Sequence, residues 1–224
     1  MFRYIVPLIF GLVGTAVLVS LGTWQLRRVE WKEAILADID ARIMAAPTAL
    51  PDTPDPEADR FLPVRVSGTF GDDEILVLVS VKQVGPGYRV IAPFETTDGR
   101  RIMVDRGFIP TEDEAKPRGA VAATLVGNLH WPDEIDGYTP EPDLKRGIWF
   151  ARDVPAMAKA LDTEDVLLIL SATSEPEPAA LPLPVDSAGI PNDHLGYAIQ
   201  WFGLAMVWFG MTGFFLWRLS RRRH

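Results

Sequence analysis

Two uncharged stretches near the two ends of the chain constrain its fold more than any other feature. Residues 4–26 and 195–217 are each 23 positions long and contain no Asp, Glu, Lys or Arg. A helix rises about 1.5 Å per residue, so each stretch would extend roughly 34 Å, enough to cross the hydrocarbon core of a bilayer. The sequence therefore predicts a membrane hairpin that carries one large domain between its two spans.

The distribution of charge predicts on which side of the membrane the domain lies. Four Arg residues follow the second span within residues 218–224, and Arg3 precedes the first span. Residues 27–194 contain all 30 Asp and Glu residues but only 17 of the 22 Lys and Arg residues. Short basic flanks stay in the cytoplasm, whereas long domains are translocated largely regardless of charge. Arg27 and Arg28 oppose this orientation, but the basic tail outnumbers them.

We therefore expect a multi-pass protein of a bacterial inner (plasma) membrane, with both termini in the cytoplasm and the acidic domain in the periplasm. A cleaved signal peptide is the alternative for the first span, but its apolar region would be shorter and small residues would mark its cleavage site. The span instead ends in the sequence GTWQLRR at residues 22–28, so we expect a retained anchor. The chain contains no Cys, which excludes disulfides and thiolate chemistry and leaves the redox compartment open.

The region between the spans changes from helical to strand periodicity. Isoleucines at four-residue spacing predict that residues 27–46 continue the first span as an exported amphipathic helix, which the prolines from Pro47 onward would end. Within residues 57–174, alternating and β-branched apolar runs predict five to seven strands. Residues 153–161 predict a short helix with Asp153 as its N-cap. Residues 175–193 are rich in proline and predict a stiff tether.

The expected fold class is thus an α+β membrane protein, with two transmembrane helices that flank one mainly antiparallel β domain outside the cytoplasm. The strands follow one another closely along the chain, which favours antiparallel pairing. Residues 4–26 form the first transmembrane helix in this organisation, residues 194–217 form the second, and residues 218–224 are the cytoplasmic tail.

Motifs for catalysis and for metal binding are absent from the sequence. It contains no Walker loop, no Gly-x-Gly-x-x-Gly, no His-Glu-x-x-His and no Gly-x-Ser-x-Gly. Three His and no Cys argue against a zinc site made by protein alone. The acidic runs 72–74 and 112–114 could bind a cation, although such runs are usually solvated turns. The acidic domain argues against binding nucleic acid. We therefore expect no enzymatic activity.

His194 stands out because it opens the second span, at the outer interface of the membrane. A neutral imidazole can ligate a metal, and Tyr197, Trp201 and Trp208 follow His194 at offsets of three, seven and fourteen, near one helix face. Small residues allow helices to approach closely. The two spans are therefore expected to pack together beside an aromatic-lined slot, through these small residues: Gly11, Thr15 and Gly22 in the first span and Gly196, Gly203 and Gly210 in the second.

Two interpretations of these aromatic residues remain open. They are typical of an interfacial belt of Tyr and Trp, in which His194 would be an ordinary polar residue. However, Trp201 and Trp208 lie too deep for such a belt if His194 marks the interface. A slot for a flat, apolar porphyrin whose iron needs an imidazole ligand is the second interpretation.

Five segments resemble the signatures of the Surfeit locus protein 1 family of cytochrome c oxidase assembly factors, as a bacterial member. They are GTWQLRR (22–28, followed by Lys32), GYRVIAPF (87–94), VDRGFIP (104–110), WFARDVPAMA (149–158) and NDHLGYAIQWF (192–202). The order of the segments matches the family and runs from one span to the other. The chain departs from the family pattern at Phe108, where a Trp is usual.

This resemblance implies an assembly factor that binds haem a and assists its delivery into subunit I of cytochrome c oxidase. It maps the proposed iron ligand onto His194. Trp24, Gln25, Tyr197 and Trp201 are candidates for the haem pocket or for contact with subunit I. The implied partners are subunit I and membrane lipid, with haem A synthase as a further candidate, but no nucleic acid.

Two alternatives to a haem-binding assembly factor remain. A purely structural chaperone of subunit I would have no cofactor of its own. An exported hydrolase or an oxidoreductase acting on haem is disfavoured, because no motif supplies a nucleophile with its base. The sequence also leaves open whether Asp105 and Arg106 serve the function or form a buried pair in the core.

Overall fold

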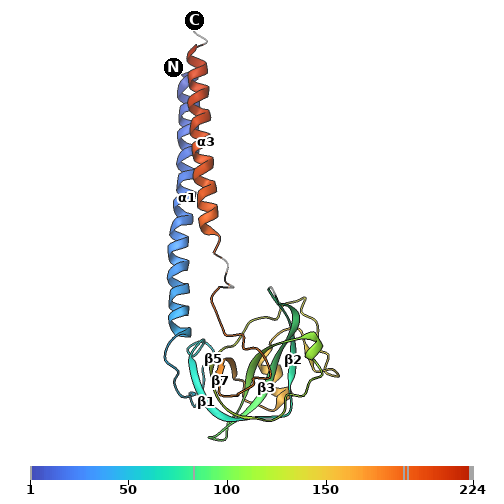
Figure 1. Ribbon diagram of the computed structural model, residues 1–224. Coiled ribbons are helices and arrows are strands. Elements are labelled where there is room, and N and C mark those ends of the chain that lie inside the picture. Colours follow the sequence, from blue (N-terminus) through green and yellow to red (C-terminus); the bar gives the residue numbers. More distant parts are fainter. Residues whose placement is uncertain (1, 83, 189, 191, 222–224) are drawn as a thin grey trace. The chain divides into compact units, whose positions relative to one another are not determined.

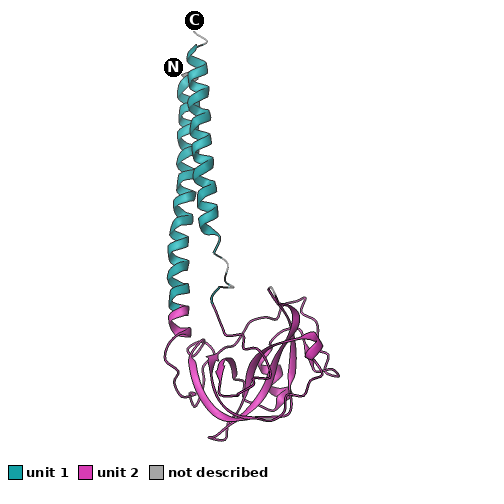
Figure 2. Cartoon of the chain, viewed as in Figure 1, with its two compact units in different colours: residues 1–38, 187–224 teal, residues 39–186 magenta. Residues whose placement is uncertain are grey.

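The protein divides into two compact units (Figure 2). The computed structural model describes residues 2–82, 84–188, 190 and 192–221. One unit consists of Met1–Asp38 and Ser187–His224 and is called the helix pair below; the other, Ile39–Asp186, is called the sheet unit. The helix pair and the sheet unit are described separately.

The helix pair is built from the two ends of the chain. Helix α1 (Phe2–Ile43) and helix α3 (His194–Arg221) lie side by side (Figure 1) and are both long and apolar enough to cross a membrane. Helix α1 is continuous, so the membrane span and the amphipathic segment expected at residues 27–46 are one helix. It ends three residues before the expected boundary at residue 46, because Thr48 is already extended and donates its backbone N–H to Pro63 O at 3.0 Å.

The sheet unit contains seven strands, one short α-helix and one 3-10 turn among its described residues. The elements are β1 (Pro63–Phe70), β2 (Ile75–Val81), β3 (Gly85–Thr96), β4 (Arg101–Pro110), η1 (Thr111–Asp113), β5 (Ala122–Leu129), β6 (Ile148–Trp149), α2 (Val154–Leu161) and β7 (Leu167–Thr173). The expected helix at residues 153–161 is confirmed, and the Asp153 side chain caps it by accepting a hydrogen bond from Ala156 N at 3.1 Å.

The strands form a closed ring with an extension. The order is β1-β5-β7-β4-β3, and β3 pairs back with β1 to close the ring; β2 and then β6 continue the sheet from β3. The pairs β4–β7 and β2–β6 are parallel and all other pairs are antiparallel. The expectation of a mainly antiparallel sheet between two apolar helices is therefore confirmed.

Alternating residues of the strands fill the interior of the ring. Val64, Val66 and Phe70 of β1 are all buried, as their spacing of two predicts, and Phe70 packs edge-on against Phe94 at 4.9 Å between ring centroids. A second apolar cluster lies under helix α2, where Met157 and Leu161 cover the sheet. These two clusters hold the sheet unit together.

The proline-rich segment expected to be a tether is, up to Asp186, part of the sheet unit. Leu181 pairs with Phe108 like a short strand: each backbone N–H donates to the other carbonyl, at 2.7 and 2.9 Å. Gly107 makes this approach possible, because it has a φ of +117° and a Cβ there would lie 2.0 Å from Leu181 O. The segment thus begins as a strap along β4.

One buried ion pair attaches the start of this strap to the sheet. Arg106 Nη2 lies 2.9 Å from Glu175 Oε2, and the two side chains are only 2% and 4% exposed. The Arg106 guanidinium also lies over the Phe70 ring, 4.1 Å from its centroid. The sequence left the role of Arg106 open, and its position in the sheet unit is that of a buried structural residue.

Asp105 has a comparable structural position. Its side chain is fully buried, 2.7 Å from Arg89 Nη1 and 3.5 Å from Arg152 Nη1, and it accepts a hydrogen bond from Gly107 N at 3.1 Å. Arg152 is in turn ion-paired with Glu134. A buried carboxylate keeps its charge only with such partners, so Asp105 links three segments of the sheet unit.

We predict that Arg106→Ala lowers the free energy of unfolding of the sheet unit by about 3–5 kcal/mol, because it leaves the Glu175 carboxylate buried without its cation. A double variant, Arg106→Met with Glu175→Leu, should recover most of that loss, since no unpaired charge remains. Urea unfolding followed by tryptophan fluorescence would measure both. Equal losses in the single and double variants would contradict this account.

His130 is the most strongly perturbed titrating side chain of the sheet unit. Burial lowers its pKa from 6.5 to about 4, and the nearby Arg152, Arg60 and Arg89 add to this effect, whereas Glu134 opposes it. Its Nδ1 is buried without a hydrogen-bond partner, and its ring stacks on Phe61 at 5.2 Å. The folded state therefore favours the neutral imidazole.

This shift predicts a pH-dependent part of the stability. In the unfolded chain His130 takes up a proton below about pH 6.5, but in the folded state it does so only below about pH 4. Between these values the unfolded state binds more protons, so the free energy of unfolding falls as the pH drops through this window. His130→Gln removes this part of the dependence. The difference between variant and wild type in unfolding free energy, measured from pH 7 to pH 4, should change steadily; a constant difference would contradict the prediction.

Candidate functional site

Small residues of α1 set how closely the two helices of the pair approach. A Cβ placed on Gly11, Gly14 or Gly22 would lie 2.1, 2.4 or 2.8 Å from the nearest side-chain atom of α3. The side chains they face are Thr212, Trp208 and Phe202, respectively. In lipid the hydrophobic effect does not drive apolar helices together, and their association depends instead on close van der Waals packing of this kind. The expected packing of the first span through Gly11 and Gly22 is confirmed.

The prediction that the glycines of the second span pack against the first span was wrong. A Cβ on Gly196, Gly203 or Gly210 would meet nothing within 4 Å, so this face of α3 is turned away from α1. The buried positions are Ala198 and Ala205. These alanines lie two residues after a glycine, and two residues correspond to a rotation of about 200° around a helix.

Trp208 belongs to this helix contact. Its indole N–H donates to Gly11 O at 3.1 Å, and its ring packs against Phe10 at 5.4 Å between centroids. Two hollows of about 270 and 350 Å³ flank it, both lined by Phe10 and Trp208. At 1.5 Å per residue, Trp208 lies about 21 Å along α3 from His194. Trp208 thus locks the helices together at a distance from His194.

His194 and Gln25 meet at the other end of the contact. His194 is the first residue of α3, and its Nδ1 lies 2.9 Å from Gln25 Oε1. Gln25 is 9% exposed, which makes it the only buried polar residue among the described residues of α1 and α3. Because Oε1 can only accept, Nδ1 is the donor in this contact, and a neutral His194 imidazole then carries its lone pair on Nε2.

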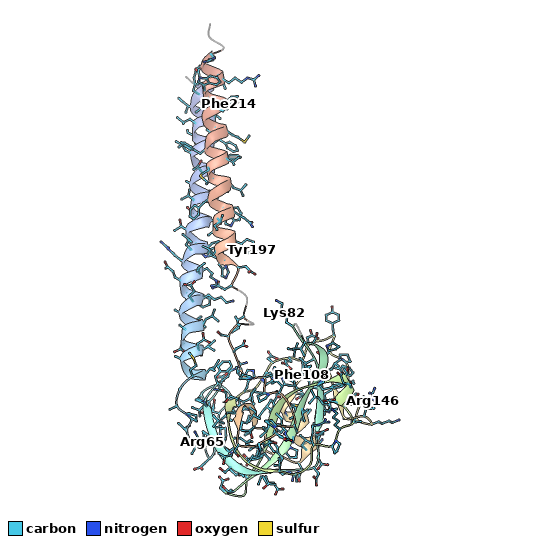
Figure 3. All side chains as sticks on the ribbon, in the orientation of Figure 1. Arg65, Lys82, Phe108, Arg146, Tyr197 and Phe214 are labelled. Atoms are coloured by element: carbon cyan, nitrogen blue, oxygen red, sulfur yellow. The ribbon has the colours of Figure 1, made fainter. Side chains whose placement is uncertain are left out.

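The other expected site residues lie around this pair with different exposures. Trp24 and Tyr197 are 56% and 52% exposed on the surface of the helix pair, and Trp201 is half-buried. Tyr197 lies near the start of α3 (Figure 3). The structure therefore joins His194 to Gln25 and leaves flat aromatic side chains exposed nearby.

Sequence reasoning missed Phe202 and Thr212, which complete the contact with Gly22 and Gly11. A signal for Thr212 is present in the sequence, since it follows Ala198 and Ala205 at the same seven-residue spacing. No group of three or more His, Asp or Glu side chains that could hold a metal ion occurs within the part of the chain that the structure describes.

We predict that Gly22→Leu separates the helices near His194, whereas Gly203→Leu, on the open face of α3, does not. Because the chain has no Cys, spin labels on cysteines introduced at the exposed positions Leu26 and Leu195 can report the distance between the helices near His194. The distance should increase in the Gly22 variant and stay unchanged in the Gly203 variant. Equal distances in both would mean that Gly22 does not set the approach.

Comparisons with known proteins assign the chain to a family. The model of the SURF1 family matches residues 12–206. Surfeit locus protein 1 of Rattus norvegicus is 31% identical over 171 residues, which cover 66% of this chain and 56% of that protein. The chain thus spans little more than half the length of this relative.

Two SURF1-like proteins match over more of their own length. That of Monosiga brevicollis is 31% identical over 80% of this chain and 76% of that protein. That of the bacterium Rickettsia felis is 27% identical over 84% of this chain and 87% of that protein. The family match covers the whole sheet unit and part of each helix of the pair, and the chain belongs to the SURF1 family.

Proposed function

We propose that this protein is an assembly factor for haem-copper cytochrome c oxidase, which binds haem a through His194 and assists its delivery into subunit I. The contact between His194 Nδ1 and Gln25 Oε1 carries the proposal. A metal-ligating His commonly donates its other ring N–H to a fixed acceptor, which sets the tautomer and the ring direction. Gln25 supplies such an acceptor from the neighbouring helix.

The surroundings of His194 are better suited to binding a haem than to binding a free metal ion. A single imidazole cannot hold a free metal ion tightly, but a haem supplies four nitrogen ligands of its own and requires only axial ligands from protein. Trp24 and Tyr197 offer exposed aromatic faces for an apolar macrocycle. When bound, haem a would bring its iron; His194 would hold it, and Gln25 would orient His194.

The proposed orientation follows from charge. Both termini would lie in the cytoplasm of a bacterium, the two helices would cross the inner membrane, and the acidic sheet unit would lie in the periplasm. His194 would then lie at the outer surface of the membrane. The proposed partners are oxidase subunit I and membrane lipid, with haem A synthase as a further candidate that would supply the haem.

A structural chaperone of subunit I without its own cofactor is the second candidate. The observation that favours it is the packing of Trp208, which fills the helix contact without any ligand. Exposed apolar side chains on both helices could then contact the helices of subunit I directly. Neither candidate requires enzymatic chemistry, and the haem content of the purified protein separates them.

We predict that His194→Ala, in protein co-expressed with haem A synthesis, removes most of the bound haem without reducing membrane insertion. Oxidase activity should fall with it, and additional haem A synthase should not restore it fully. Visible absorption of the purified protein gives the haem content, and its abundance in membranes gives the control. Unchanged haem content in a well-expressed variant would favour the structural chaperone.

Variants of Gln25 refine this test. Gln25→Leu removes the acceptor and should weaken haem binding about 10–100-fold, the usual effect of losing such a hydrogen bond. Gln25→Glu keeps an acceptor at the same place and should retain more haem than Gln25→Leu. We expect haem affinity to be highest in the wild type, lower in Gln25→Glu and lowest in Gln25→Leu.

A further inference from the structure

Three basic side chains follow Gln25 along α1 and have no acidic partner. Arg27, Arg28 and Lys32 form no ion pair with any carboxylate in the described part of the chain. In the sheet unit seven arginines are ion-paired (Arg89, Arg100, Arg101, Arg106, Arg118, Arg146 and Arg152), while other cations there, such as Arg65 and Lys145, are in no ion pair among the described residues. What distinguishes the cations of α1 is their place next to the His194–Gln25 contact, where they can receive an anionic ligand.

Helix geometry separates these cations into two faces. At 100° per residue, Lys32 lies within about 20° of the direction of Gln25, and Arg28 within about 60°. Arg27 is rotated by about 200° and lies on the far side of the helix. The exposures agree for Lys32, which is half-buried like its neighbours on that face, whereas Arg27 and Arg28 are both exposed. By direction, Lys32 follows Gln25 on the face of α1 that meets α3, and Arg28 lies at the edge of that face.

Arg28 is also held in place. Its guanidinium carbon lies 4.4 Å from the centroid of the Trp31 ring, one turn further along the helix. A cation stacked on an aromatic face retains its N–H donors, which remain available at the edges of the guanidinium plane. Along the helix axis, Arg28 and Lys32 follow Gln25 by about 4.5 and 10.5 Å.

We propose that Arg28 and Lys32 bind the two propionate carboxylates of the haem while His194 holds its iron. This inference rests on the proposed haem binding at His194. An iron porphyrin carries both propionates at one edge, so a ligand held by His194 can present two negative charges towards one side. Arg and Lys form charge-assisted hydrogen bonds with carboxylates, and the guanidinium fork can engage both oxygens of one carboxylate. Arg27 has no part in this recognition.

Phosphates of anionic lipids are the competing partner for the same cations. Basic side chains at the end of a membrane span often contact headgroups, and such contact would involve Arg27 as much as Arg28. Propionate recognition differs in two ways: it depends on the face of the helix, and it disappears when the propionates are esterified. These differences define the experiment.

The test uses the full-length protein in nanodiscs of phosphatidylcholine alone, titrated with iron protoporphyrin IX and, separately, with its dimethyl ester. The Arg28→Gln, Lys32→Gln double variant should raise the dissociation constant for iron protoporphyrin IX about 10–100-fold and leave that for the ester unchanged. Arg27→Gln and Lys32→Gln each remove one positive charge: the Arg27 variant should bind both probes like the wild type, whereas the Lys32 variant should bind only the ester like the wild type. Absorbance of the bound iron porphyrin is the readout.

Several results would overturn the inference and leave the proposed function standing. In the first, the wild type binds the two probes with equal affinity. In the second, the Arg27 variant loses as much affinity for iron protoporphyrin IX as the double variant. In the third, the double variant loses affinity only in discs that contain anionic lipid. The last result would assign the cations to lipid phosphates. A wild-type protein that binds neither probe, or whose affinity is unchanged by His194→Ala, would instead overturn the proposed function and this inference with it.

Discussion

The close approach of two helices from opposite ends of the chain determines what the rest of the helix pair can do. Gly11 accommodates Thr212 and Gly22 accommodates Phe202, so the antiparallel register of α1 and α3 is fixed by contacts that leave no room for a larger side chain. This register brings His194 next to Gln25, although 169 positions separate them in the sequence. A rotation of either helix would lose both the packing and the hydrogen bond.

The sheet unit is stabilised in a different way. It buries charged side chains in its interior, where each one has a specific partner: Arg106 lies against Glu175, and Asp105 against Arg89. Such pairs add little net stability compared with apolar side chains of the same size, but breaking them is costly. Their effect is to hold the strap at Leu181 and the end of β4 in one arrangement.

Local features of the sheet unit could be predicted from the sequence, because neighbouring residues determine them. The alternation of Val64 and Val66, the cap at Asp153 and the Asp-Gly turn with Gly99 at a φ of +87° all follow from local chemistry. The closure of the ring and the parallel β4–β7 pair join segments that are distant in sequence. No periodicity encodes those partners. The face of α3 that meets α1 was mispredicted for a related reason, since small residues occur on more than one of its faces.

The candidate site illustrates the same limit. Its place at the start of the second span singled out His194, and the family resemblance added Gln25, but the hydrogen bond between them depends on the register of two separate helices. Once that register is known, the basic residues beyond Gln25 can be sorted by direction. By direction around α1, Lys32 and, less closely, Arg28 follow Gln25, and Arg27 does not, although all three look equivalent in the sequence. The orientation expected from charge places these cations on the outer side of the membrane, where the distribution of basic residues disfavours them. A ligand with carboxylates at that position would account for their presence.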